Sequence, residues 1–270
     1  MNPKLEFHEC CRAFAASYDI SALPAMREIE HEVLGCDYGG TSWTTRAQAE
    51  QIAGLLRLGP GISLLEIGAG SGWPGLYLAS ESGCDVTLLD LPVSALAIAR
   101  QRARADGHDD RVSAVAASGD ALPFLDGSFD AIEHSDVLCC LPAKEEMLAE
   151  CRRVAADGAR MLFSVIYAPA GLTTAAYREA VEVGPPFVAA PAAYPQLIEQ
   201  TGWRLDSATD VTREYVGSLR ALVRGFEGSK SIVAELGAHA IVESIRHRET
   251  QIDAIERGYL VREVFLATAA

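Results

Sequence analysis

The sequence lacks any long apolar run. Its two longest stretches without a charged residue, residues 161–177 and 183–198, are broken by prolines and glycines. Both fall short of the roughly 20 apolar residues that a membrane-spanning helix requires. The first eleven residues mix charged with apolar side chains and lack the apolar segment of a secretory signal peptide. We therefore expect no membrane association and a cytoplasmic location.

Basic residues are also scarce. The 270 residues include 23 Lys+Arg against 37 Asp+Glu, so the formal net charge is −14 and the pI is near 4.8. A surface of this sign repels the phosphate backbone of nucleic acids. The short basic run Arg246, His247 and Arg248 stands among acids and is interpreted as a solvated helix face. We expect a small-molecule partner and no nucleic acid, and the sequence leaves a homodimer open.

Patterns of metal ligands are missing as well. The seven cysteines include two adjacent pairs, Cys10–Cys11 and Cys139–Cys140, and none of them has the spacing of a zinc site. An odd count without such spacing is typical of reduced thiols in a cytosolic protein. We expect no bound metal.

What the sequence does contain is an alternation of short apolar runs with segments of helical periodicity, which predicts an α/β fold with a parallel sheet and crossover helices. Pro74 and Pro142 open two of the predicted helices, and Gly83 and Gly158 close them. The predicted strands are residues 62–67, 85–89, 112–116, 129–133, 160–166, 203–211 and 259–267.

Helical patterns precede and interrupt this core. Thr45 and Gln48 form a capping-box signature in the N-terminal segment, and amphipathic stripes precede the last strand. Helices in these positions can cover the ligand edge of an α/β sheet. We predict a helical N-terminal cap over residues 1–58, a cofactor-binding core over 59–212, a helical lid over 213–257 and a last core strand over 258–270.

The most informative motif, EIGAGSGWPG, directly follows the first predicted strand. Gly68, Gly70 and Gly72, with Ala69 between the first two, permit positive φ and a close approach of ligand to main-chain N–H groups at a helix N-terminus. Glu66 is placed to hold an ammonium group while the loop amides face a carboxylate. The motif therefore predicts a ligand cradle.

Acidic residues follow the next two predicted strands. Asp90 stands at the end of the second strand, where an acid accepts hydrogen bonds from both hydroxyls of an adenosine ribose. Asp120, followed by Ala121, comes after the third strand and can accept a hydrogen bond from the amine of adenine. Together with the glycine loop, these residues predict contacts to one nucleoside from three strand ends.

The same loop fits a second pattern. Gly70, Gly72 and Gly75 spell GxGxxG, and Asp90 lies 20 residues beyond Gly70, which is the fingerprint of a dinucleotide site. An NAD(P)-dependent oxidoreductase is therefore an alternative. The end of the first strand favours Gly68 as the first glycine instead, which suits a cofactor with an amino-acid tail.

Four stretches together, EIGAGSG, LLDLP, GDALP and FDAIEHSDVLCCLP, resemble the class I S-adenosylmethionine-dependent methyltransferases over about residues 60–166. Within that family the chain is similar to the small-molecule branch that includes ubiquinone/menaquinone C-methyltransferases and sarcosine/dimethylglycine methyltransferases. The resemblance implies a Rossmann-like seven-stranded sheet, mostly parallel with an antiparallel last strand. It also implies S-adenosyl-L-methionine as cofactor and in-line methyl transfer to an O, N or C nucleophile.

The resemblance further implies roles for individual residues. The glycine loop contacts the methionine moiety, Asp90 the ribose, Leu91 and Ala121 the faces of adenine, and Asp120 its amine. Ser135, at the end of the fourth strand, lies beside the sulfonium.

One departure from the family pattern concerns catalysis. Members of this branch often carry two histidines where this sequence has Cys139 and Cys140. His134 and Asp136 are predicted to replace the missing imidazole as catalytic residues, with His134 pointing at the cleft. A base is needed only when the acceptor carries a proton; otherwise alignment suffices.

Aromatic residues supply candidate walls for the acceptor. Tyr18, Tyr38, Trp43 and Tyr177 lie in segments predicted to cover the cleft, and such rings suit a flat apolar acceptor and a cationic sulfonium. A protein that binds the cofactor without transfer, as a sensor or partner, is the remaining alternative.

Overall fold

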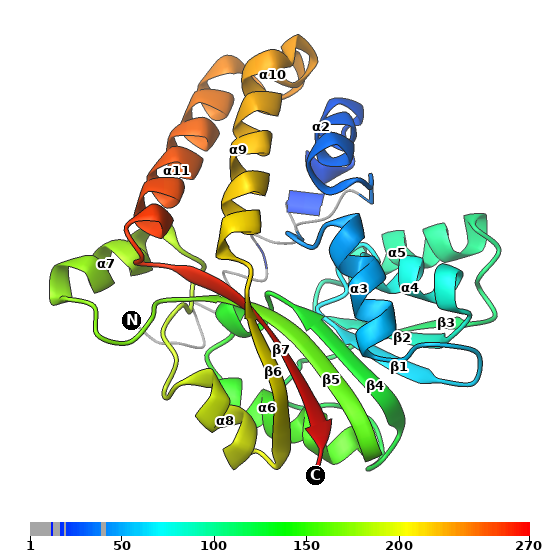
Figure 1. The fold of residues 1–270 in the computed structure, drawn as a ribbon. Coiled ribbons are helices and arrows are strands. Elements are labelled where there is room, and N and C mark those ends of the chain that lie inside the picture. The colour runs from blue at the N-terminus through cyan, green and yellow to red at the C-terminus, as the bar shows by residue number, and fades with distance from the viewer. Residues whose placement is uncertain (1–11, 13–16, 19, 39–41) are drawn as a thin grey trace.

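The computed structural model describes residues 12, 17–18, 20–38 and 42–270, and its centre is a seven-stranded sheet (Figure 1). The strands lie in the order β3-β2-β1-β4-β5-β7-β6. β1 pairs in parallel with β2 and β4, whereas β7 runs antiparallel to both β5 and β6. The bounds are β1 Ser63–Ile67, β2 Asp85–Asp90, β3 Val112–Ala116, β4 Phe129–Ser135, β5 Ala155–Tyr167, β6 Trp203–Asp210 and β7 Val261–Ala269. The predicted Rossmann-like sheet with an antiparallel last strand is confirmed.

Strand β5 differs most from the prediction. It begins at Ala155, directly after α6, rather than at residue 160. Gly158, the predicted helix terminator, lies inside β5 with a φ of 74°, where the pairing with β4 is irregular. A glycine with positive φ serves an irregular strand as well as a helix end, so the pattern alone does not distinguish the two.

Helices cover both faces of the sheet. α3, α4 and α5 pack against the face that carries Leu64 and Leu88, and α6 and α8 pack against the face that carries Leu65 and Phe163. The bounds are α2 Pro24–Leu34, α3 Arg46–Leu55, α4 Gly75–Ser82, α5 Val93–Ala105, α6 Lys144–Val154, α7 Thr174–Val183, α8 Tyr194–Gln200, α9 Thr212–Gly228, α10 Lys230–Leu236 and α11 Ala238–Glu256, with a short 3-10 helix η1 at Leu138–Cys140. Within the described ranges, none of the helices has the length and apolar character needed to cross a bilayer.

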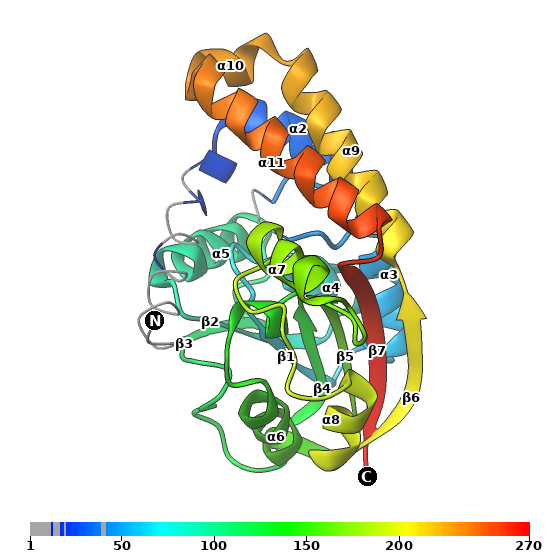
Figure 2. The ribbon, with the colours of Figure 1, turned by 90° about the vertical axis from the view of Figure 1, so that its left-hand side faces the viewer.

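Four helices, α2, α9, α10 and α11, form a lid above the carboxyl ends of the parallel strands (Figure 2). Ile29 of α2, Phe226 of α9 and Ile241 of α11 belong to one apolar cluster that holds these helices together. α3 begins at the predicted capping box of Thr45 and Gln48 and packs against α4, so it belongs to the sheet layers rather than to the lid. The division of the chain after residues 58, 212 and 257 stays a prediction.

Candidate active site

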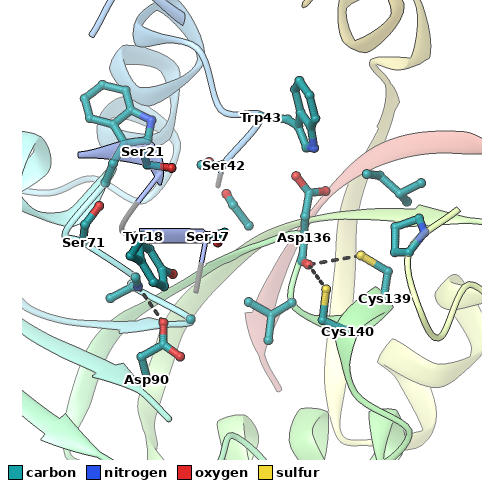
Figure 3. Close-up of a pocket in the computed structure, with 18 of the residues that line it drawn as sticks. Ser17, Tyr18, Ser21, Ser42, Trp43, Ser71, Asp90, Asp136, Cys139 and Cys140 are labelled. Carbon is teal, nitrogen blue, oxygen red and sulfur yellow. Dashed lines mark hydrogen bonds between the residues drawn. The ribbon is translucent and has the colours of Figure 1, made fainter. Parts of the chain in front are cut away.

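A cavity of about 920 Å³ lies between the carboxyl ends of the central strands and the lid. Its floor includes the loop after β1 and the ends of β2 and β4, and its roof includes side chains of α2, α9 and α11. In Figure 3, Asp90 and Asp136 mark two sides of the floor, and Trp43 lies above Asp136. The volume is at the upper end of the range of small-molecule sites, and the position is where α/β sheets bind ligands.

The glycine loop forms part of the floor. Gly68 and Ala69 donate hydrogen bonds to the Leu89 carbonyl at 2.8 and 3.1 Å, which ties the loop to the end of β2. Gly70 has a φ of 52°, and a Cβ there would lie 2.5 Å from the Tyr18 hydroxyl. The predicted positive φ values are confirmed, and these three loop residues line the cavity.

Gly72 has a different role. It does not line the cavity, and a Cβ at this position would lie 2.5 Å from Leu76 and 3.2 Å from Ala99. Close packing of the loop against α4 and α5 therefore requires this glycine, and its contact with the cofactor stays a prediction.

Two buried glutamates face the cavity from neighbouring strands. Glu66 of β1 and Glu133 of β4 are partners in the parallel register, with exposed fractions of 1% and 0%. Glu66 Oε1 accepts a hydrogen bond from the Gly75 N–H at 3.0 Å, and Glu133 Oε1 accepts one from the Ser135 hydroxyl at 2.5 Å. The Oε2 atom of each glutamate has no hydrogen-bond partner among the described residues.

This arrangement changes the protonation of the pair. Burial raises the pKa of Glu66 well above its usual value, and the neighbouring Glu133 raises it further. Burial also raises the pKa of Glu133, to about 8. Two carboxylates this close in an apolar setting do not both ionise readily, so the pair retains a proton near neutral pH.

Asp90 ends β2 and lines the cavity. Its Oδ2 accepts a hydrogen bond from the Gly70 N–H and its Oδ1 accepts one from the Leu91 N–H, each at 2.7 Å. Burial raises the pKa of Asp90, and these two N–H donors act in the opposite direction. Each oxygen keeps a lone pair for a further donor, as the predicted ribose contact requires. Leu91 also lines the cavity, with 37% of its surface exposed.

The residues after β3 that line the cavity come before the two that the sequence predicted. Ala117, Ser118 and Gly119 line the wall, whereas Asp120 and Ala121 do not. Asp120 instead accepts a hydrogen bond from the Ser118 hydroxyl, which turns its carboxylate along the loop. The contact of Asp120 and Ala121 with adenine stays a prediction.

The structure contradicts the prediction that His134 points at the cleft. Its side chain is fully buried and stacks on Phe163, with 4.7 Å between the ring centroids. Because side chains alternate along a strand, Glu133 and Ser135 face the cavity and His134 faces the opposite side of the sheet. Burial lowers the pKa of His134 to about 3, and its ring nitrogens have no hydrogen-bond partner among the described residues. His134 is therefore a neutral core residue.

Asp136 follows β4 directly and lines the cavity, with a φ of 56° that aspartate tolerates better than most residues. Its carboxylate receives hydrogen bonds from Arg262 of β7, at 2.9 Å from Nη2 and 3.0 Å from Nε, and from the Ser164 hydroxyl at 3.1 Å. Its carbonyl accepts the thiols of Cys139 and Cys140 at 3.1 and 3.4 Å (Figure 3). The ion pair with Arg262 fixes Asp136 at the sheet edge.

The structure separates the four predicted aromatic wall residues. Tyr18 and Trp43 line the cavity, whereas Tyr38 and Tyr177 do not. The ring of Tyr38 packs beside Trp73, 5.2 Å away between centroids, and Tyr177 is 40% exposed on α7. Both side chains therefore lie outside the lining of the cavity in this structure, and their contact with the acceptor stays a prediction.

The sequence analysis missed the polar residues that the lid contributes. Arg248 and Gln251 of α11 line the cavity, so the interpretation of Arg248 as a solvated surface residue is wrong. Glu133 was also missed. A glutamate in the middle of an apolar strand is the signal that identifies such a residue, because buried carboxyls are rare.

Comparison with known proteins assigns the family. Residues 65–163 match the model of a methyltransferase domain. The 27-O-demethylrifamycin SV methyltransferase of Amycolatopsis mediterranei is 32% identical over 190 residues, which cover 68% of this chain and 69% of that relative. The chain belongs to the class I S-adenosylmethionine-dependent methyltransferases.

Other known proteins are similar in sequence or in fold. Methyltransferase GfsG of Streptomyces halstedii is 28% identical to this methyltransferase over 220 residues, covering 78% of this chain and 77% of GfsG. A solved structure of geranyl diphosphate methyltransferase with S-adenosylmethionine has a TM-score of 0.72 at 17% identity and covers 94% of each chain. The [4+2]-cyclase SpnF has a TM-score of 0.75 at 17% identity and covers 96% of each chain, which shows the fold alone.

S-adenosylmethionine is the cofactor of this methyltransferase, and its acceptors are small molecules, which decides against the NAD(P)-dependent alternative. The cavity fits this cofactor. The unpartnered Oε2 atoms of Glu66 and Glu133 suit the ammonium of the methionine moiety, and Gly70 has no room for a Cβ beside Tyr18. The contacts of individual residues with the cofactor stay predictions.

Proposed function

We propose that this methyltransferase transfers a methyl group to an oxygen atom of a bulky, largely apolar small molecule. The observation that carries the proposal is the cavity of about 920 Å³, which extends from the glycine loop to the lid. Met26, Leu222 and Phe226 of the lid offer it apolar side chains. The relative named 27-O-demethylrifamycin SV methyltransferase supports the choice of oxygen, since its name specifies that atom.

The residues of the chain would bind and align the two molecules. S-adenosylmethionine supplies an electrophilic methyl group when bound. Asp90 accepts hydrogen bonds from the ribose hydroxyls, and the free Oε2 atoms of Glu66 and Glu133 accept those of the ammonium. The lid excludes water, so that alignment in a closed site supplies much of the rate.

Asp136 is the proposed proton acceptor. Its carboxylate is 11% exposed and lines the cavity, and Arg262 fixes its orientation. Asp136 Oδ2 can therefore accept a hydrogen bond from an acceptor hydroxyl and then its proton as the methyl group is transferred. A positioned base of this kind contributes about 10²–10⁴ in rate. His134 is excluded from this role because it faces the opposite side of the sheet.

Incubation with S-adenosylmethionine and either 27-O-demethylrifamycin SV or sarcosine, followed by mass spectrometry, tests the proposal. We expect the first acceptor to gain one methyl group and sarcosine to gain none. Asp136→Asn should lower kcat by about 10²-fold or more with a smaller change in KM. Asp157→Asn, at an exposed position in β5, is the matched control and should leave both unchanged.

Methylation of sarcosine but not of the bulky acceptor contradicts the proposal. Binding of S-adenosylhomocysteine without transfer to either acceptor would favour a sensor or partner role. Full turnover by Asp136→Asn would remove Asp136 as the proton acceptor.

A further inference from the structure

Helix α11 brings a cation to the cavity. Arg248 lines the cavity, and its guanidinium lies over the Trp43 ring, 5.4 Å from the ring centroid. Its Nη1 donates a hydrogen bond to Gln251 Oε1 at 3.2 Å. Among the residues that the structure describes, no carboxylate forms an ion pair with Arg248. A half-buried arginine without an anionic partner, in the wall of a ligand cavity, is available to a ligand.

The surroundings of Arg248 fix its orientation. Gln251 is 3% exposed, and its Nε2 donates to the Val183 carbonyl at 3.2 Å, so its oxygen is left to face the guanidinium. A guanidinium presents five N–H donors in a planar fork, and Gln251 accepts from only one of them. Burial lowers the pKa of Arg248, which means that the guanidinium has lost part of its hydration. The remaining donors suit a bidentate anion.

The distribution of charge restricts where an anion can lie in the cavity. The pKa of His247, which also lines the cavity, is lowered first by burial and then by Arg248, so His247 is neutral near pH 7. A negative group is therefore attracted beside Arg248 and repelled wherever acidic side chains line the cavity. The acidic side chains that line the cavity among the described residues are Glu30, Glu66, Asp90, Glu133 and Asp136.

We propose that the preferred methyl acceptor carries a carboxylate that pairs with Arg248, which turns the far end of the acceptor toward Asp136. This inference rests on the proposed function. One arginine balances one negative charge, so a carboxylate fits better than a phosphate dianion, and its two oxygens match the guanidinium fork. Trp43, against the guanidinium, and Phe226, in the lid, contact the apolar body of the acceptor.

Matched acids and amides test this specificity. Naphthylacetic, biphenylacetic and deoxycholic acids and their primary amides are titrated by calorimetry into protein saturated with S-adenosylhomocysteine. We expect at least one acid to bind the wild-type protein about tenfold or more tightly than its amide. Arg248→Gln should abolish that preference and Arg248→Lys should keep part of it. Arg246→Gln, which removes an exposed arginine paired with Glu243 on the same helix, should keep it fully.

The inference is overturned when no acid binds the wild-type protein more tightly than its amide, or when Arg248→Gln retains the preference. In either case methyl transfer to 27-O-demethylrifamycin SV still supports the proposed function. If the wild-type protein prefers the acids but methylates neither acceptor, the result contradicts the proposed function and leaves the Arg248 inference standing. An affinity of Arg248→Gln for S-adenosylhomocysteine within about twofold of wild type confirms that the variant is folded. If Arg248→Gln does not fold, Arg248→Lys replaces it in the comparison of acids with amides, and an acid preference as strong as that of wild type then overturns the inference.

Discussion

Glu133 provides a quantitative test of the buried carboxyl pair. Burial raises its pKa from 4.5 to about 8, so the folded protein keeps the proton while the unfolded chain releases it above pH 4.5. The stability contributed by this proton is complete below pH 4.5 and is lost as the pH rises toward 8. At about 1.4 kcal/mol per pH unit, the cofactor-free protein loses about 5 kcal/mol across this window.

Glu133→Gln removes this titration while its amide oxygen can still accept the Ser135 hydrogen bond. We expect the cofactor-free variant to be more stable than wild type by several kcal/mol at pH 8 and to match it near pH 4.5. Its affinity for S-adenosylhomocysteine should fall by about tenfold, since the ammonium loses one anionic partner. Urea unfolding across this pH range and calorimetry measure the two effects.

Glu182→Gln is the control, because Glu182 is exposed on α7 and its removal should change the free energy of unfolding by less than about 0.5 kcal/mol. The reasoning is refuted by a Glu133→Gln variant that is no more stable than wild type at pH 8, or one that keeps the wild-type dependence on pH. An unchanged affinity for S-adenosylhomocysteine would separate Glu133 from the ammonium.

Three further substitutions test other parts of the site. Asp90→Asn should weaken S-adenosylhomocysteine binding by about tenfold or more in calorimetry, because an amide nitrogen replaces an acceptor oxygen; unchanged affinity would remove Asp90 from the ribose. His134→Phe should leave that affinity within about twofold and raise the stability to urea by about 1 kcal/mol, since two unpartnered ring nitrogens leave the core; lost affinity would contradict its assignment to the core. Arg262→Met should lower the free energy of unfolding by about 3–5 kcal/mol, because the carboxylate of Asp136 stays behind without its partner. Adding Asp136→Asn to this variant should recover part of that loss; if the effects of the two substitutions simply add, the ion pair does not stabilise the fold.

The succession of strands and helices along the core and the cofactor loop were predictable because their signals are local. A strand, a glycine loop and a helix follow one another within a few residues, and Asp90 comes at the end of the next strand. The conformation of such a turn depends on its own residue types, since Gly68 and Gly70 adopt positive φ and thereby allow close approach. The sequence alone therefore determined the cradle and its nearest acid.

The direction of side chains at the end of β4 was decided by the tertiary structure. Because helices cover both faces of the sheet, the residues of β4 are buried on both sides, and the sequence of this strand does not distinguish its two faces. Only the position of the lid makes one face a cavity, which selects Glu133 and Ser135 and leaves His134 in the core.

The same is true of the opposite wall. Arg248 stands in a helix that is inserted between β6 and β7, and its charge among exposed neighbours is typical of a solvated surface. It reaches the cavity because α11 packs on α9 and also on α7, which lies far before it in the sequence. The sequence by itself determined which residues give the cofactor loop its conformation. The packing of the lid over the carboxyl ends of the strands decided which side chains face the acceptor, because this packing depends on contacts between segments far apart in the chain.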